Sequence, residues 1–176
     1  MVEFKICWNT RQWSRYTDFY IEHRQRIIPG YRLSHALTDV RICMKQGRAA
    51  LLNDERGRVI GIGGFVLGTH ENQYRDKQIA VLGNSYFLED YHNNRTFVRG
   101  LQVLAEQIRE ANPDVREVRI PTAADNPYTN RLYRKLAEKH HSFDTEYGVF
   151  HMYATSYRDF ADFCDRFRGD PLLNAN

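Results

Sequence analysis

A short polar stretch between an apolar run and an amphipathic run is the part of the chain best suited to bind a ligand. The stretch reads "HNNRTFVRG" and spans His92–Gly100. It follows the apolar, aromatic run Ile79–Leu88 and precedes the amphipathic run Leu101–Ile108, which predicts a turn from a strand into a helix. The first N–H groups of a helix have no partner inside the helix and lie at the positive end of its dipole, so such turns bind anions. Arg95 and Arg99 would add charge-assisted hydrogen bonds to a phosphate.

Other residue types that carry chemistry do not form a recognised site. Gly61, Gly63 and Gly64 do not make a nucleotide-binding loop, because Val66 stands where a third glycine is needed and a further strand follows. A bulge or a close backbone approach within a strand is the preferred interpretation. The histidines are scattered without metal-ligand spacing, and no G-x-S-x-G motif is present. We therefore expect no metal site and no nucleophilic hydrolase.

The first half of the chain is predicted to contain strands and helices in a mixed order. Period-two alternation indicates a strand over residues 2–8, and apolar residues three and four positions apart indicate a helix over 13–27. A second helix is predicted over 34–45. The apolar runs 48–54 and 58–70 are separated by a polar turn and predict a hairpin.

The second half continues the alternation of strands and helices. The predicted elements are a strand over 77–90, a helix from Asn94 to Asn112, a strand over 118–120, a helix begun by Asn126-Pro127, one late strand over 143–149 and a C-terminal helix over 157–167. His140 and His141 are expected at a helix end, where cations are favoured. This order indicates a single mixed α/β (α+β) domain over residues 1–168, with 169–176 as a tail.

Composition limits the class of protein. The chain has 176 residues, of which 27% are charged and 42% apolar, as in an ordinary globular domain. The net charge of +3 is too small to suggest nucleic-acid binding. Cys7, Cys43 and Cys164 form no C-x-x-C motif, and no signal peptide or membrane-spanning run is visible. We expect a cytoplasmic protein that does not enter a membrane.

The region Leu82–Leu136 resembles the GNAT acyl-CoA N-acyltransferase superfamily. The signature turn of that family is Arg or Gln, two residues, Gly, one residue, then Gly or Ala. Arg95–Gly100 matches its first and last positions, while Val98 replaces the first glycine. A second family element is an asparagine seven residues before a helical tyrosine, and Asn126 and Tyr133 stand at that spacing. The order of elements matches over nearly the whole chain.

The resemblance implies a GNAT-like domain with a mixed central β-sheet flanked by helices. It also implies transfer of an acetyl or other acyl group from acyl-CoA to an amine by direct attack. The pantetheine arm would lie between the strand ending at Glu89 and the strand Val118–Ile120, with the N–H of Leu88 polarising the thioester carbonyl. The residues that the resemblance suggests for binding coenzyme A are Phe87, Leu88, Asn94, Arg95, Thr96, Phe97, Val98, Arg99, Gly100, Leu101 and Asn126.

The resemblance implies catalytic roles as well. Tyr133 would donate a proton to the leaving thiolate, although its spacing from Leu132 and Leu136 also fits a core aromatic. Glu89 is the first candidate for the base that deprotonates the amine. Its rivals are Asp90, His92 and Glu146, and Glu89 and Asp90 also fit plain polar residues at a strand end.

Two further functions are compatible with this fold. One is a non-catalytic module that binds acyl-CoA or a partner, and the other is an enzyme that modifies a nucleobase or a tRNA. The basic clusters at 22–26 and 131–135 fit solvated helix faces better than a nucleic-acid site. The amine acceptor, a small molecule or a protein, would bind among the aromatic segments 13–31 and 143–153, which favours a partly apolar or flat acceptor. A homodimer is left open.

Overall fold

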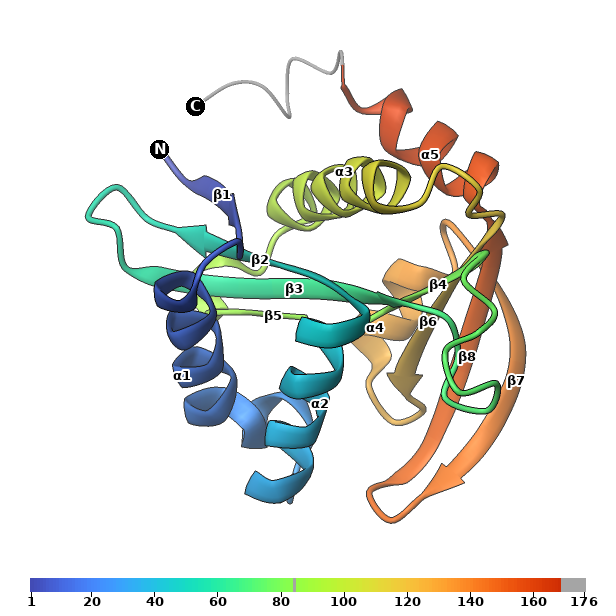
Figure 1. Ribbon diagram of the computed structural model, residues 1–176, viewed down its shortest axis with the longest axis horizontal. Coiled ribbons are helices and arrows are strands. Elements are labelled where there is room, and N and C mark those ends of the chain that lie inside the picture. Colours follow the sequence, from blue (N-terminus) through green and yellow to red (C-terminus); the bar gives the residue numbers. More distant parts are fainter. Residues whose placement is uncertain (84, 169–176) are drawn as a thin grey trace.

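The computed structural model describes residues 1–83 and 85–168 of the chain. The tail expected over residues 169–176 lies outside the described residues. The chain forms one eight-stranded mixed sheet with helices on both of its faces (Figure 1). The α/β fold class expected from the sequence is thus confirmed.

The first half of the chain forms the elements that its hydrophobic patterns predict. They are β1 (Glu3–Ile6), α1 (Thr10–Ile27), α2 (Leu33–Gln46), β2 (Gly47–Asn53) and β3 (Val59–Leu67). Helix α1 begins with a capping box, in which Asn9 and Gln12 each bind the other's backbone N–H. Its stripe of aromatic residues places Tyr16, Phe19 and Tyr20 in the core.

The second half differs from the prediction at its end. Its elements are β4 (Ile79–Leu82), β5 (Tyr86–Phe87), the short 3₁₀ helix η1 (Glu89–Tyr91), α3 (Asn94–Ala111), β6 (Glu117–Ala123), α4 (Pro127–Tyr133), β7 (Glu138–Thr145), β8 (Gly148–Ser156) and α5 (Tyr157–Arg166). The single strand predicted over 143–149 is wrong, because Glu146 and Tyr147 form the turn between β7 and β8. The helix-end position of His140 and His141 is also wrong, because both lie in β7.

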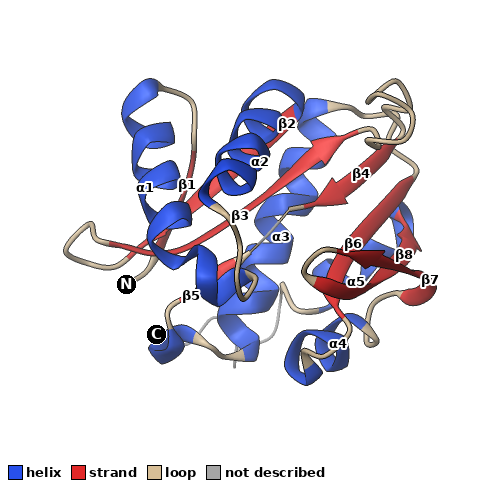
Figure 2. Cartoon of the chain, turned by 90° about the horizontal axis from the view of Figure 1, so that it is seen from below, coloured by secondary structure: helices blue, strands red, loops and turns tan. Residues whose placement is uncertain are grey.

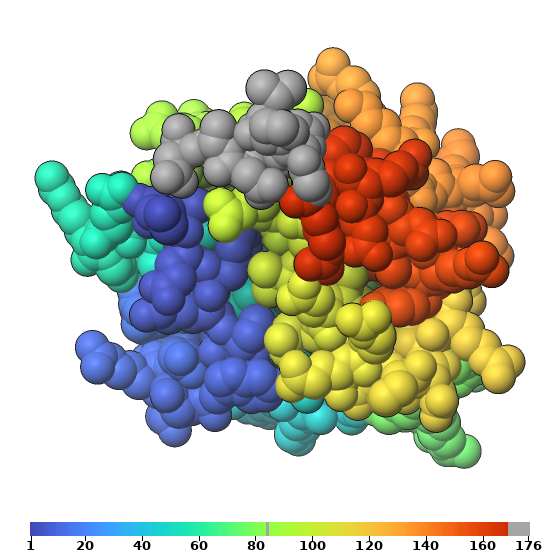
Figure 3. All heavy atoms as spheres, turned by 90° about the horizontal axis from the view of Figure 1, so that it is seen from above, coloured from blue at the N-terminus to red at the C-terminus, as the bar shows by residue number. Residues whose placement is uncertain are grey.

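The sheet order is β1-β2-β3-β4-β6-β8-β7, and β5 also pairs with β3. All neighbours are antiparallel except β4 and β6, which are parallel. Helices α1 and α2 cover one face of the sheet, and α3 and α5 cover the other (Figure 1). Figure 3 shows α3 and α5 side by side on their face of the sheet. The core on this face includes Phe65, Val118 and Tyr153.

A break between β4 and β5 opens the sheet. Phe65 faces Leu82 and Ile62 faces Tyr86, so three residue steps on β3 oppose four on the β4–β5 segment. Such an extra residue bends a strand and ends its regular pairing. Strand β4 pairs with β6 only as far as Val81, after which β5 stays beside β3 while β6 runs on toward α4 (Figure 2). The two strands separate there and leave a cleft between them.

Candidate active site

The cleft between β5 and β6 has a volume of about 170 Å³. Its opposite walls are the segments Ser85–Phe87 and Pro121–Ala123. Side chains of α4 and the aromatic residues His92 and Phe97 also line it. The sequence placed the pantetheine arm opposite Val118–Ile120. The part of β6 that lines the cleft begins at Pro121, just beyond that range. Val118 and Arg119 are still paired with β4.

The backbone of β5 presents one N–H group to the cleft. The N–H of Leu88 donates to the carbonyl of Ile60 at 2.9 Å, so the expectation that Leu88 polarises a thioester carbonyl is wrong. Groups along an antiparallel strand face its neighbour at every second residue, so the N–H and C=O of Phe87 face away from β3. The carbonyl of Phe87 contacts Nε2 of His92. The N–H of Phe87 is thus the donor directed at the cleft.

Tyr133 is the last residue of α4 and lines the cleft. Its ring packs between those of Phe97 and Tyr153, with centroid separations of 5.9 and 6.1 Å. No hydrogen bond to its hydroxyl occurs among the described residues. Burial raises the pKa of Tyr133 to about 12, with a smaller contribution from Tyr128. The phenol is therefore protonated throughout the physiological pH range and is free to donate to a ligand.

Buried polar contacts fix the position of α4. Asn126 caps the helix by accepting a hydrogen bond from the N–H of Thr129 at 3.2 Å, as the sequence predicted. The side-chain amide of Asn130 donates to the carbonyl of Ala123 at 2.9 Å and accepts from the Tyr153 hydroxyl at 2.7 Å. Asn130 joins α4 to β6 and β8 in this way. Sequence reasoning missed it because an asparagine inside a helix carries no motif that indicates its bonds to β6 and β8.

The motif Arg95–Gly100 lies within the first two turns of α3 and not in a loop before it. The helix starts at Asn94, and its first internal hydrogen bond runs from the N–H of Phe97 to the carbonyl of Asn93 at 3.1 Å. The side chain of Asn93 accepts from the N–H of Thr96 at 2.8 Å. Free N–H groups were expected at the helix start, and within the motif and its neighbour Asn94 only those of Asn94 and Arg95 lie before these bonds.

The later residues of the motif pack against the protein. Val98 and Leu101 are buried, so the valine that replaces a glycine faces the core. A Cβ atom on Gly100 would lie 3.4 Å from the ring of Phe87 and 3.8 Å from that of Phe4. Gly100 therefore lies at the contact between α3 and the strand that forms one wall of the cleft.

Arg95 and Arg99 nevertheless mark a surface suited to an anion. Together with Asn93 and Thr96 they line a hollow of about 410 Å³ at the start of α3. Neither arginine forms an ion pair within residues 1–83 and 85–168. Glu55 borders the same hollow but pairs with the amino group of Met1. Two unpaired guanidinium groups beside a helix N-terminus fit the charge of a pyrophosphate.

The structure does not bring Glu89 into the cleft. Its side chain is 74% exposed and lies 3.5 Å from Arg26. Neither Glu89 nor Asp90 lines the cleft or the cavity that adjoins it. Of the rival bases, His92 lines the cleft, where its ring stacks on that of Tyr128 at 6.0 Å, and Glu146 lines the neighbouring cavity.

A second cavity of about 530 Å³ adjoins the cleft on the face covered by α1 and α2. Both aromatic segments expected around an acceptor, 13–31 and 143–153, contribute to its lining. Helix α2 and Tyr74 also line it, which the sequence did not indicate. The residues that border both the cavity and the cleft are Ile28, Gly83, Pro121 and Phe150. We call these four residues the junction.

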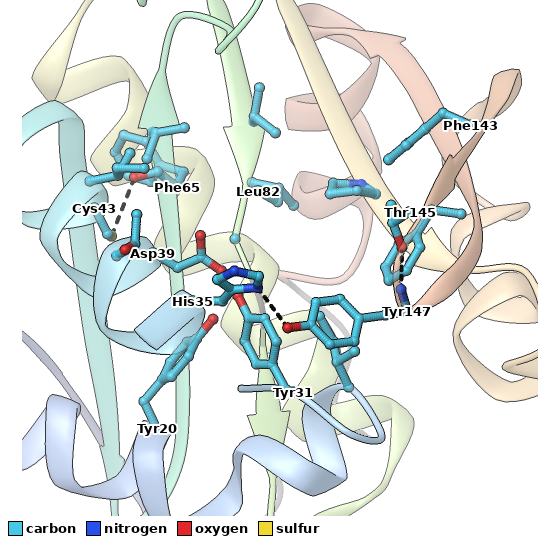
Figure 4. Close-up of a pocket in the computed structure, with 18 of the residues that line it drawn as sticks. Tyr20, Tyr31, His35, Asp39, Cys43, Phe65, Leu82, Phe143, Thr145 and Tyr147 are labelled. Carbon is cyan, nitrogen blue, oxygen red and sulfur yellow. Dashed lines mark hydrogen bonds between the residues drawn. The ribbon is translucent and has the colours of Figure 1, made fainter. Parts of the chain in front are cut away.

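Polar side chains are grouped on two sides of this cavity (Figure 4). Nδ1 of His35 lies 2.6 Å from the hydroxyl of Tyr147 and 3.3 Å from Glu146, which also pairs with Arg32. One turn further along α2, Asp39 faces the cavity, and burial raises the pKa of its carboxyl group to about 6. A hydrogen bond from Tyr20 opposes this rise.

Two other kinds of function find no site in the described part of the chain. Within it, no group of three or more His, Cys, Asp or Glu side chains could hold a metal ion. Its helices are all too short or too polar to cross a membrane.

The fold is shared with acetyltransferases of known structure. By sequence, the chain matches no family model and no curated protein. By structure, it is similar to a GNAT-family acetyltransferase from Staphylococcus aureus Mu50, with a TM-score of 0.64, 10% identity, and coverage of 88% of this chain and 99% of the other. A phosphinothricin acetyltransferase from Sinorhizobium meliloti in complex with AcCoA gives a TM-score of 0.65 at 15% identity, covering 88% of both chains.

A third similar structure is the ribosomal-protein-S18-alanine N-acetyltransferase from Escherichia coli. It gives a TM-score of 0.64 at 15% identity, covering 89% of this chain and 94% of the other. The chain therefore has the fold of the GNAT acetyltransferases, as its motifs indicated. At these identities the similarity establishes the fold and leaves the acceptor open.

Proposed function

We propose that the protein is an acyltransferase that moves an acetyl or similar acyl group from acyl-CoA to an amine. The observation that carries this proposal is the junction, where the cleft between β5 and β6 meets the cavity under α1 and α2. A thioester in the cleft and an amine in the cavity would meet there. The AcCoA complex of the phosphinothricin acetyltransferase supports the assignment of the first ligand.

The cleft fits the pantetheine arm of coenzyme A, and the hollow at the start of α3 fits its phosphates. The strand edges of β5 and β6 can hold the amide groups of pantetheine, while Asn94, Arg95 and Arg99 would bind the pyrophosphate at the start of α3. When bound, acyl-CoA would supply the thioester carbon that the amine attacks. The N–H of Phe87 would stabilise the negative charge that develops on the carbonyl oxygen. Asn126 borders the cleft and stays a candidate contact.

Tyr133 would act at the sulfur atom. Its hydroxyl is free to donate to the thiolate as the carbon–sulfur bond breaks, and the rings of Phe97 and Tyr153 hold it in place. The amine must lose a proton, and His35, oriented by Glu146 and Tyr147, is better placed to receive it than the exposed Glu89. His35 lies on α2 and does not line the cleft. We therefore expect a water molecule to carry the proton from the amine to His35.

Two measurements test this function. Titration calorimetry should detect acetyl-CoA binding, and release of the free thiol should depend on added amine. Replacing both arginines, Arg95→Ala with Arg99→Ala, should weaken acetyl-CoA binding by about tenfold or more, because two charge-assisted contacts are lost. Arg116→Ala together with Arg158→Ala, two exposed arginines outside the cleft and the hollow, serves as the charge-matched control. Absence of binding by acetyl-CoA and by longer acyl-CoAs would refute the proposal, whereas binding without turnover by any amine would favour a non-catalytic module.

A further inference from the structure

The cavity next to the cleft is unusual in the charges that it contains. Its lining includes Asp39 and Glu146, together with His35, and no lysine or arginine. The negative charge of Glu146 is compensated, because this carboxylate pairs with Arg32 and His35. Asp39 has no ion pair with any residue in the described ranges. A carboxylate that is partly withdrawn from water costs free energy unless a cation accompanies it.

Tyrosine side chains line the cavity that contains this carboxylate. Tyr16 and Tyr20 of α1 and Tyr31 are buried residues of its lining, and Tyr74, from the segment between β3 and β4, lines it as well. Tyr20 donates a hydrogen bond to Asp39 and so holds the carboxylate in one orientation. The faces of tyrosine rings attract cations and also accept alkyl chains. The combination of a fixed carboxylate and several tyrosines is suited to an alkylammonium group.

Asp39 lines the cavity but belongs neither to the cleft nor to the junction. The lining of the cleft includes no residue of α2 and no residue of the segment that carries Tyr74. The junction is formed instead by Ile28, Gly83, Pro121 and Phe150. An amine that attacks a thioester at the junction is thus a different group from a cation that pairs with Asp39.

We propose that the acceptor is a small diamine-like molecule, with a reacting amine at the junction and a second, cationic amine paired with Asp39. This inference rests on the proposed acyl transfer and adds the class of acceptor. The segment between the two amines would be apolar, because the cavity lining also includes Ile42, Phe65, Val66 and Leu82. Acceptors with a carboxylate at the second position would be rejected by repulsion from Asp39.

The test compares acceptors of equal length. Hexylamine, hexamethylenediamine and aminocaproic acid differ only in the group at the far end, and the shorter series butylamine, putrescine and aminobutyric acid allows for cavity depth. We expect the best diamine to exceed its matched monoamine by about tenfold or more in kcat/KM, and the amino acid to be the poorest acceptor. In Asp39→Asn the kcat/KM of the diamine should fall to within about twofold of that of the monoamine.

A charge-matched control separates recognition from a general charge effect. Asp162→Asn removes one exposed carboxylate from α5, on the opposite face of the sheet, and should keep the diamine preference. Equal kcat/KM for diamine and monoamine in the unaltered protein would overturn the inference while leaving acyl transfer intact. A diamine preference that survives in Asp39→Asn would overturn it as well.

Binding supplies a readout that does not need turnover. With coenzyme A present, the diamine should raise the melting temperature more than the monoamine does, and this difference should vanish in Asp39→Asn. No difference between the two ligands in the unaltered protein would contradict the role of Asp39. If acetyl-CoA fails to bind or to be consumed, the proposed function fails, and the melting experiment with the amines alone still decides whether Asp39 binds a cation.

Discussion

At the scale of single residues, the pKa of Tyr133 limits how it can act. A phenol with a pKa of about 12 transfers a proton to a thiolate with a pKa of about 8.5 at a cost of roughly 5 kcal/mol. Tyr133 is therefore better suited to donate a hydrogen bond while charge builds on sulfur than to complete the transfer. The proton lost by the amine can reach the sulfur in a later step.

This role predicts the behaviour of Tyr133→Phe. Turnover should fall by about 10²-fold, because the donor to sulfur is lost, while affinity for acetyl-CoA should stay within a few-fold. The melting temperature should hardly change, since the hydroxyl has no hydrogen-bond partner among the described residues. A thioester with a more acidic leaving thiol should recover part of the rate. Unchanged turnover in a folded mutant would remove Tyr133 from the mechanism.

Two substitutions test whether His35 or Glu89 is the base. His35→Gln should lower kcat/KM by about 10²-fold at neutral pH, and Glu89→Gln should change it by less than about threefold, because Glu89 is directed to solvent and to Arg26. The pH–rate profile of both mutants should be recorded with a single acceptor. A larger effect of Glu89→Gln would restore the assignment made from the sequence.

Asp39 is predicted to cost stability in the free protein. Its pKa is about 6 in the fold against 3.8 in the unfolded chain, so the folded state disfavours the charged form. The cost starts as pH rises above 3.8, is complete above about pH 6, and is on the order of 1–3 kcal/mol. The other titratable groups facing Asp39 are Tyr16, Tyr20, Tyr74, Cys43 and His35.

Asp39→Asn should therefore raise the melting temperature by several degrees at pH 8 and leave it nearly unchanged at pH 4. Thermal unfolding at both pH values checks this, with Asp162→Asn as the control that shows no such difference. A loss of stability at pH 8 would mean that the carboxylate has a structural partner. Stability gained together with the loss of diamine preference is the pattern of a residue kept for ligand binding.

At the scale of elements, Gly100 shows how α3 and β5 set the width of the cleft. A methyl group there would meet the tip of the Phe87 ring at 3.4 Å, which is ordinary contact, and alanine is favoured over glycine within a helix by about 1 kcal/mol. Gly100→Ala should therefore keep acetyl-CoA binding and fold at least as stably. Gly100→Leu should displace Phe87 and weaken binding by about tenfold or more. Calorimetry and melting curves on both mutants test this, and equal binding by both would show that the contact is unimportant.

The elements also show how far the sequence predicted the structure. Most helices and strands carried a clear period and were predicted, and the stripe of α3 is buried as expected. The β7–β8 hairpin was missed because β7 lies at the edge of the sheet and its first five residues are exposed, so no alternation marks it. The motif Arg95–Gly100 was expected to be a turn, and it is helical because Asn93 caps α3 by accepting a hydrogen bond from the N–H of Thr96.

The candidate site was predicted only in part, because a motif can be recognised only among residues that are close in sequence. Residues close in sequence, such as those around Arg95 and Tyr133, carried motifs that could be recognised. Asp39 and His35 carried none, because their significance arises only when α2 packs over β3 and meets the β7–β8 turn. The donor facing the cleft was assigned to Leu88 and not to Phe87, because the pairing register of a strand with an extra residue cannot be deduced from alternation alone.

At the scale of the whole molecule, the open sheet joins the cleft and the cavity, which are the two proposed ligand sites and meet at the junction. The extra residue between β4 and β5 separates β5 from β6, and α4 is held against β6 by the contacts of Asn130. Acyl donor and acceptor would thus approach from different directions and meet where the strands separate. A ligand that passes through the junction should therefore occupy both sites at once.

A bisubstrate compound tests this arrangement. Coenzyme A joined through its sulfur, by an acetyl linker, to one nitrogen of a diamine should bind at least about 10²-fold more tightly than coenzyme A, because the second binding event becomes intramolecular. The matched compound made from a monoamine should gain less, and Asp39→Asn should remove the difference between the two. Calorimetry gives the three affinities. If the bisubstrate compound binds no more tightly than coenzyme A alone, the cleft and the cavity are not joined for ligands, and direct transfer through the junction is excluded.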